Sequence, residues 1–146
     1  MRVYCDTSAL LKRVVLEDES GALTDALDEH HGSGAVLCAS TLAWVEVSRA
    51  LRNVSSTGHA EVADDVEDAL SGVHEQLISP AVTALARRVR PDRLRSLDAI
   101  HLASALVIDA DVVLTYDERL ARACADNGLR VATPGTPQRA TRRRGK

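Results

Sequence analysis

The sequence has 146 residues, of which 45% are apolar and 27% are charged, and its formal net charge is −3. This length predicts one domain with a core of its own, and the composition excludes intrinsic disorder. Phe is absent and aromatic residues make up 2% of the chain, so the sequence lacks the stacking platforms on which single-strand-binding modules depend.

The charge is unevenly distributed along the chain. Five of the 18 basic residues lie in residues 138–146, which contain no acid, so residues 1–137 carry 13 basic residues against 21 acidic ones. We therefore expect an acidic domain over residues 1–135 and a basic, flexible tail over residues 136–146. The three cysteines form no Cys-x-x-Cys motif, and no apolar run is long enough to span a membrane, which together predict a soluble, cytoplasmic protein.

The first half of the chain alternates short apolar runs with helical patterns. Residues 2–5 are β-prone and stop at Asp6, and residues 35–39 form a continuous apolar run, typical of a strand buried on both faces of a parallel sheet. The helices predicted in this half are residues 9–16, 21–31, 41–53 (with Ser40 and Thr41 supplying the cap) and 59–73.

The second half continues the alternation. Strands are predicted at residues 76–79, 112–115 and 129–132, and helices at residues 81–89, 97–108 and 118–127. A basic loop, residues 87–95, contains five arginines and Pro91. Strands that alternate with helices predict a parallel sheet with helices on both faces.

Two acidic residues occupy equivalent positions, each directly after a predicted strand. Asp6 follows the first strand and Asp117 follows the fourth, with Thr7, Ser8 and Thr115 as neighbouring hydroxyls. If the two strands are neighbours, both carboxylates reach the same crevice at the carboxyl edge of the sheet, where open α/β sheets bind their ligands. Alternatively, each aspartate only caps the helix that follows it, which contributes about 1 kcal/mol.

Two more acidic residues lie on predicted helices. Asp98 stands in the first turn of a helix whose other positions are almost all apolar, and a buried carboxylate is rare without a partner. A favourable interaction with the helix dipole is the alternative explanation for Asp98. Glu46 borders the apolar face of its helix, three residues before Arg49, with which it could form a plain surface ion pair instead.

Several carboxylates that meet in one cleft repel each other unless a cation neutralises them. Oxygen ligands without a His or Cys cluster suit Mg²⁺ or Mn²⁺. Such sites support the hydrolysis of phosphate esters, because the metal activates water and stabilises the charge on the leaving oxygen. The four acids therefore predict a metal site with hydrolytic chemistry.

Four stretches of the sequence resemble PIN domains, most closely the toxin ribonucleases of VapBC toxin–antitoxin modules. They are residues 6–10 (Asp-Thr-Ser-Ala-Leu), 42–46 (Leu-Ala-Trp-Val-Glu), 96–103 (Ser-Leu-Asp-Ala-Ile-His-Leu-Ala) and 114–120 (Leu-Thr-Tyr-Asp-Glu-Arg-Leu). The motifs occur in the family's order and spacing, no acid is missing, and the resemblance extends from the first strand to about Ala132.

The resemblance implies a three-layer α/β/α sandwich around a central parallel sheet of about five strands. It implies that one or two Mg²⁺ or Mn²⁺ ions, and the water that cleaves RNA, are held by Asp6, Glu46, Asp98 and Asp117, with Ser8 and Thr115 as supporting polar groups. It also implies a homodimer and a cognate antitoxin that blocks the active-site groove. The expected function is that of a metal-dependent endoribonuclease toxin.

Other functions and roles stay open from the sequence alone. The chain could be a PIN-like module that binds RNA or a protein without cutting, or a phosphatase or DNA nuclease with the same carboxylate–metal chemistry. His101, three residues after Asp98, is either a site residue or a core histidine with a buried partner. The arginines of residues 87–95 either hold RNA phosphates beside Asp98 or form a solvated loop.

Overall fold

The central element of the fold is a five-stranded parallel sheet. In a computed structural model, which describes residues 1–54 and 59–137, the strands are arranged in the order β3-β2-β1-β4-β5. Their bounds are β1 (Arg2–Cys5), β2 (Val36–Ser40), β3 (Val73–Gln76), β4 (Val112–Leu114) and β5 (Val131–Ala132). β1 lies in the middle and pairs with both β2 and β4, so the first and fourth strands are neighbours, which is the condition for Asp6 and Asp117 to reach the same crevice.

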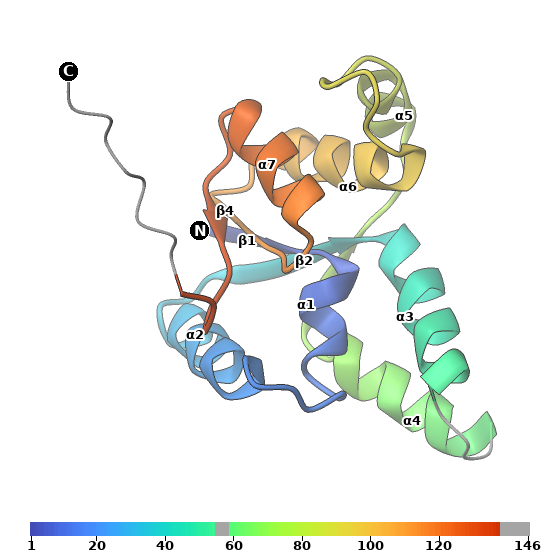
Figure 1. The fold of residues 1–146 in the computed structure, drawn as a ribbon, viewed down its shortest axis with the longest axis vertical. Helices are drawn as coiled ribbons and strands as arrows, with labels where there is room; N and C mark the ends of the chain where they lie inside the picture. Colours follow the sequence, from blue (N-terminus) through green and yellow to red (C-terminus); the bar gives the residue numbers. More distant parts are fainter. Residues whose placement is uncertain (55–58, 138–146) are drawn as a thin grey trace.

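Helices cover both faces of this sheet (Figure 1). One layer contains α1 (Thr7–Leu11), α2 (Ser20–Gly32), α3 (Thr41–Val54) and α4 (His59–Leu70). The other contains α5 (Pro80–Ala86), α6 (Ser96–Val107) and α7 (Glu118–Asp126). The predicted three-layer α/β/α sandwich is therefore confirmed.

Strands β1 and β4 divide their side chains between two hydrophobic cores. In β1, Val3 and Cys5 pack into the core beneath α1–α4, whereas Tyr4 faces the core beneath α6 and α7. In β4, Leu114 and Val113 divide in the same way. This alternation follows from the two-residue period of a strand, and each fully buried aliphatic side chain contributes roughly 1.5–3 kcal/mol.

The third strand was predicted in the wrong place. It was expected at residues 76–79 after a helix that runs to residue 73, but α4 ends at Leu70 and β3 begins at Val73. Gly72 explains the difference, because its φ of +72° ends the helical geometry and turns the chain back to the sheet. Ser79, expected in the strand, instead caps α5 by accepting a hydrogen bond from Val82 N (3.3 Å).

The first helix is shorter than predicted and starts earlier. It was expected over residues 9–16, whereas α1 begins at Thr7 and ends at Leu11. Beyond it the chain forms turns in which Lys12 pairs with Glu17 and Glu19, and these contacts replace a further helical turn. β1 has its predicted bounds, and the other remaining elements differ from theirs by one to three residues, as is usual at the ends of helices and strands.

Two further predictions concern the basic tail and membrane-spanning segments. The basic tail predicted over residues 136–146 lies outside the described residues from 138 onward. Across the ranges that the structure does describe, no helix has the length and apolar character needed to cross a membrane.

Candidate active site

Asp6 lies at the carboxyl end of β1, in the centre of the sheet, and its side chain is held by three donors. Ser8 Oγ and Ala9 N donate to its Oδ1 (2.6 and 3.0 Å), and Thr115 Oγ1 donates to its Oδ2 (2.7 Å). Only 4% of the residue is exposed, and this burial raises the pKa of the Asp6 carboxyl, although the three hydrogen bonds oppose the shift. Asp6 caps α1, as the simpler alternative predicted, and it is also a fixed, buried carboxylate at the sheet edge.

Ser8 and Thr115 connect Asp6 to the strand beside it. Ser8 Oγ accepts a hydrogen bond from Tyr116 N (2.8 Å) and lies 3.4 Å from Thr115 Oγ1. Thr115 Oγ1 in turn accepts from Asp117 N (3.0 Å). The two hydroxyls therefore hold the β1–α1 and β4–α7 connections together, which places the backbone of Asp117 next to the Asp6 site.

Asp117 caps α7 and keeps part of its carboxylate available. Its Oδ1 accepts from Arg119 N (2.8 Å) and Leu120 N (3.1 Å). Among the described residues nothing donates a hydrogen bond to its Oδ2, and the side chain is only half-buried. The cap by Oδ1 explains where α7 begins. It leaves Oδ2 available to another ligand, since no described residue donates a hydrogen bond to it.

Glu46 comes from α3 and is oriented by two donors on one oxygen. Thr7 Oγ1 donates to Glu46 Oε1 (2.9 Å), and His101 Nε2 lies 2.6 Å from the same atom. Burial alone would raise the pKa of Glu46, but the hydrogen bond and charge of His101 and the hydroxyl of Thr7 outweigh it and hold the pKa below its usual value. The ion pairs between described residues include none to Arg49, so the surface-pair alternative for Glu46 is wrong.

His101 is buried between Glu46 and a tyrosine of the central strand. Its Nδ1 lies 2.7 Å from Tyr4 Oη, which accepts a hydrogen bond from Ser40 N (3.2 Å). Nε2 donates its hydrogen to Glu46, and in the neutral ring Nδ1 accepts the hydroxyl hydrogen that Tyr4 has left to donate. With this tautomer each group has a partner in a series of hydrogen bonds that connects Ser40 of β2, Tyr4 of β1, His101 of α6 and Glu46 of α3.

Asp98, in the first turn of α6, experiences the charges of the other acids. Burial raises the pKa of its carboxyl, and the negative charge of Asp117 raises it further. His101 and Arg95 oppose the shift, and Glu46 adds to it. Hydrogen bonds of Thr7 and Thr115 bring Glu46 and Asp117 beside Asp6, and the charges of Glu46 and Asp117 reach Asp98. The carboxylates therefore lie at the carboxyl edge of the sheet, and their mutual repulsion favours a bound cation.

The chemistry of these donors fits a hard divalent cation, although the ligands do not enclose one. Asp6, Glu46, Asp98 and Asp117 offer oxygen atoms only, as Mg²⁺ and Mn²⁺ prefer. Within the described residues no three acidic, His or Cys side chains lie close enough together to surround an ion as they stand. Mg²⁺ commonly retains several waters and binds through one or two carboxylates, so such a loosely assembled set is compatible with it.

Two members of this arrangement were not predicted from the sequence as site residues, namely Tyr4 and Thr7. Thr7 was noted only as a hydroxyl beside Asp6, yet its hydroxyl contacts Glu46 on another helix. Tyr4 carried one signal, because a tyrosine in a buried strand needs a partner for its hydroxyl. His101 was left between a site role and a core role, and the structure combines the two by burying it against Glu46.

The sequence matches a known family and several curated proteins. The family model described as "PIN domain" matches residues 3–126. Ribonuclease VapC47 of Mycobacterium tuberculosis is 37% identical over 135 residues, which cover 91% of this chain and 97% of that protein. Ribonuclease VapC35 of the same species is 37% identical over 137 residues, with the same coverage of both chains.

Solved structures with a similar fold come from toxin–antitoxin systems. VapBC2 from Rickettsia felis, solved bound to a DNA fragment from its promoter, has a TM-score of 0.72 at 12% identity and covers 90% of this chain and 98% of its own. VapC20 of Mycobacterium tuberculosis, described as a Sarcin-Ricin loop cleaving toxin, has a TM-score of 0.66 at 16% identity, covering 83% and 94%. At these identities the likeness concerns the fold.

Proposed function

The chain belongs to the PIN-domain family, and from this premise we propose that it is a divalent-metal-dependent endoribonuclease that acts as the toxin of a type II toxin–antitoxin pair. The observation that carries the proposal is the gathering of carboxylates at the carboxyl edge of the sheet, where Thr7 and Thr115 connect Glu46 and Asp117 to Asp6. Burial and the negative charges of Asp117 and Glu46 raise the pKa of Asp98 there. The curated relatives that share 37% identity with this chain are named ribonucleases, which supports the same activity.

The four acids would hold one or two Mg²⁺ or Mn²⁺ ions. Asp6 is oriented by Ser8, Thr115 and the first turn of α1, so its oxygens keep fixed positions. Oε1 of Glu46 is occupied by Thr7 and His101, which leaves Oε2 for a metal ion. Asp98 and the Oδ2 of Asp117 accept no hydrogen bond from any described residue. A bound divalent ion would activate water and neutralise charge on the leaving oxygen.

Ser8 and Thr115 support this site and do not attack the substrate. Ser8 donates its hydroxyl hydrogen to Asp6, a carboxylate that needs this donor to compensate for its burial. Thr115 donates to the other oxygen of the same carboxylate. These contacts support the interpretation of both hydroxyls as groups that orient Asp6, with water as the nucleophile.

The partners proposed for the chain follow from the same family membership. We propose RNA as the substrate, a cognate antitoxin that covers the active-site groove, and a homodimer, which sedimentation would detect at twice the chain mass of 15.7 kDa. VapBC2 from Rickettsia felis and the toxin–antitoxin complex from Klebsiella pneumoniae, both similar in fold, support the antitoxin. The three cysteines are free and buried, which supports a cytoplasmic location.

A digestion with three substrates tests the proposal. The purified chain is incubated with RNA, DNA and a small phosphate ester, each with Mg²⁺, with Mn²⁺ or with a chelator. We expect RNA to be cleaved only with metal and the Asp6→Asn variant to be inactive. Cleavage that persists in the chelator contradicts the metal-dependent mechanism, and RNA binding without cleavage would indicate a PIN-like binding module instead.

A further inference from the structure

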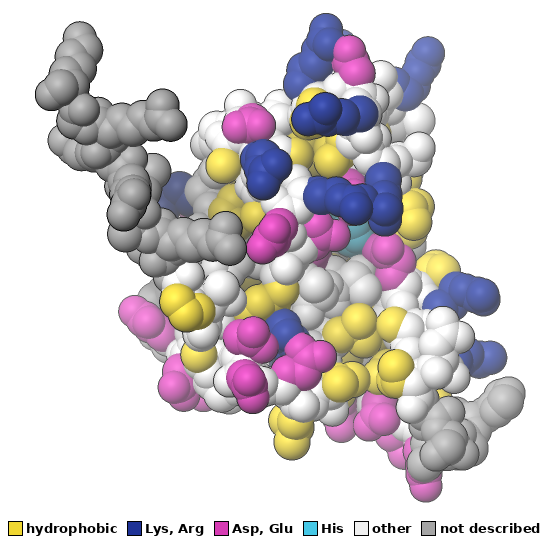
Figure 2. All heavy atoms as spheres, in the orientation of Figure 1, with side chains coloured by type: hydrophobic (Ala, Val, Ile, Leu, Met, Phe, Trp, Pro, Cys, Tyr) yellow, Lys and Arg dark blue, Asp and Glu magenta, His cyan; other side chains and the backbone are white. Residues whose placement is uncertain are grey.

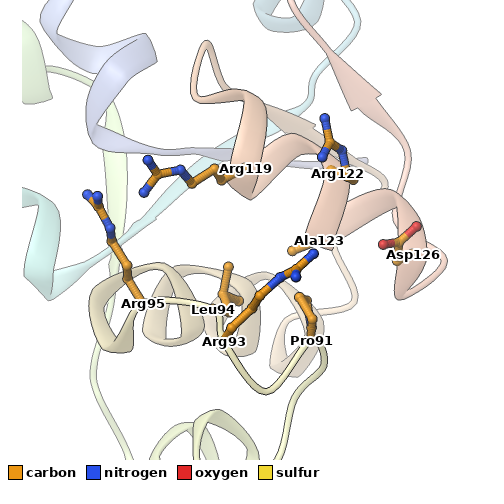
Figure 3. A pocket seen from close by; sticks show the side chains of 8 residues that line it. All are labelled: Pro91, Arg93, Leu94, Arg95, Arg119, Arg122, Ala123 and Asp126. Atoms are coloured by element: carbon orange, nitrogen blue, oxygen red, sulfur yellow. The ribbon is translucent and has the colours of Figure 1, made fainter.

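A cavity beside the carboxylate cluster lies between α7 and the loop that precedes α6 (Figure 3). Its volume is about 480 Å³, within the range of small-molecule sites and large enough for more than a single phosphate group. It is lined by Pro91, Arg93, Leu94, Arg95, Arg119, Arg122, Ala123 and Asp126. We call it the arginine cavity.

The walls of the arginine cavity carry an excess of positive charge. Four arginines line it against one acid, Asp126, and all four are exposed. None forms an ion pair with any residue in the described ranges. A guanidinium stays protonated at every physiological pH and offers a fork of donors that matches phosphate oxygens. Basic side chains gather in the same part of the surface, over α5, α6 and α7 (Figure 2).

Two arginines of the cavity are close in sequence to acids of the candidate active site. Arg95 stands three residues before Asp98, and its charge is one of those that act on the Asp98 carboxyl. Arg119 follows Asp117 by two residues, at the start of α7. In Figure 3 the side chain of Arg119 extends toward the guanidinium of Arg95, and Arg93 reaches from the loop toward α7. The guanidinium groups of Arg95 and Arg119 therefore approach each other from the two walls, and each residue is two or three positions from an acid of the candidate site.

We propose that the arginine cavity is a binding site for the phosphodiester backbone of the RNA strand, adjacent to the bond that the acid cluster cleaves. The inference rests on the proposed function, because the substrate of the acids is taken to be RNA. Guanidinium groups of both walls hold phosphate oxygens, and the apolar side chains of Pro91, Leu94 and Ala123 contact the sugar or base that lies between the phosphates.

The composition of the cavity also determines how the RNA is held. No aromatic side chain lines it, so bases do not stack there as they do on single-strand-binding platforms. Binding is therefore mainly electrostatic, weakly dependent on base sequence and strongly dependent on salt. The acidic body of the protein makes this local site necessary, because the net charge alone repels a polyanion.

The test measures RNA binding apart from cleavage. The affinity of a short, fluorescently labelled single-stranded RNA is measured by anisotropy in chelator, where cleavage is blocked, at several salt concentrations. The variant is Arg93→Gln combined with Arg119→Gln, one arginine from each wall. Arg95 is left intact because its charge acts on Asp98. The control is Arg130→Gln. Arg130 is exposed and precedes β5, at the amino ends of the strands, whereas Asp6 lies at their carboxyl ends.

We expect the double variant to bind RNA at least about tenfold more weakly. Its salt dependence should become shallower by about 1.4 in the slope of log K against log salt, since each lost phosphate contact on a single strand is worth about 0.7. Arg130→Gln should bind as the wild type does. With metal present, the double variant should show a raised KM with a kcat close to that of the wild type.

The outcomes separate this inference from the proposed function. A wild type that cleaves RNA, together with a double variant that binds RNA as tightly as the control, overturns the arginine cavity as an RNA site. The RNA site is also overturned if the double variant keeps its affinity for RNA and loses affinity only for a protein partner. A wild type that cleaves no RNA under any metal condition contradicts the proposed function itself, whatever the variant does.

Discussion

The imidazole of the buried His101 lies with its Nε2 2.6 Å from Oε1 of the half-buried Glu46. The contact joins helices α3 and α6 through two residues that are 55 positions apart in the chain. Tyr4 fixes the other ring nitrogen at 2.7 Å, so the ring cannot rotate without losing a buried hydrogen bond. We infer that His101 positions Glu46 and does not itself contact the substrate.

Replacing His101 should weaken metal binding more than it weakens the fold. We expect His101→Ala to reduce Mn²⁺ affinity, measured by titration calorimetry, by about tenfold or more, because a supporting partner of a metal ligand is commonly worth 10–100-fold. His101→Gln, whose amide can still donate to Glu46, should restore part of the affinity. The exposed His74→Ala serves as control. Equal Mn²⁺ affinity in His101→Ala and the wild type would show that His101 is only a core residue.

The hydroxyl of Thr115 should contribute to stability through Asp6. Thr115→Val keeps the shape of the side chain but removes the donor to Asp6 Oδ2 and the acceptor for Asp117 N. We expect the free energy of unfolding, measured with urea, to fall by about 1–3 kcal/mol, since a buried carboxylate loses a partner. Thr115→Ser keeps the hydroxyl and should lose less. A Thr115→Val protein as stable as the wild type would contradict the role assigned to this hydroxyl.

Asp98 should destabilise the protein when no metal is bound. The charges of Asp117 and Glu46 disfavour its ionised form, so Asp98→Asn should raise the melting temperature in chelator. Addition of Mn²⁺ should raise the melting temperature of the wild type and have a smaller effect on the variant, because binding to the folded state stabilises it. The measurement is a thermal melt of both proteins with and without Mn²⁺, and a variant less stable than the wild type in chelator would be the opposite result.

Two buried thiols should make the fold sensitive to alkaline pH. Burial raises the pKa of Cys5 and of Cys124 to about 12 each, while an unfolded thiol titrates near about 8.5. The folded state thus binds more protons than the unfolded state between these values, so the stability they contribute is present below about pH 8.5 and is lost as pH rises toward 12. The free energy of unfolding, measured with urea, should be lower at pH 10 than at pH 8, and this difference should be smaller in Cys124→Ala than in the wild type.

The sequence was informative where periodicity and position alone decide the structure. The strands before Asp6 and Asp117 were predicted to within one residue, because a short, uninterrupted apolar run is typical of a strand buried in a parallel sheet. The turn at Gly72 was missed, because a helical pattern of Val and Leu continues across it until a positive φ intervenes. Helix ends of this kind depend on one backbone angle that periodicity does not contain.

The candidate site was predictable in its residue types but not in its connections. Asp6, Glu46, Asp98 and Asp117 could be singled out because carboxylates at strand ends or on apolar helices are unusual. The hydrogen bond from Thr7 to Glu46 spans 39 residues, and that between Tyr4 and His101 spans 97, so no local pattern indicates either. The arginine cavity likewise combines a loop and a helix that the sequence presents separately.

The most direct test of the carboxylate–metal mechanism is RNA cleavage under single-turnover conditions, with Mg²⁺ or with a chelator. Three proteins are compared: the wild type, Asp98→Asn, and a control variant with the same change in charge. Asp65→Asn, on the exposed face of α4, is that control. A carboxylate–metal mechanism predicts cleavage by the wild type and by Asp65→Asn with Mg²⁺, and none by Asp98→Asn or by any protein in chelator. Cleavage by Asp98→Asn at the wild-type rate, or undiminished cleavage in chelator, would contradict a carboxylate–metal ribonuclease.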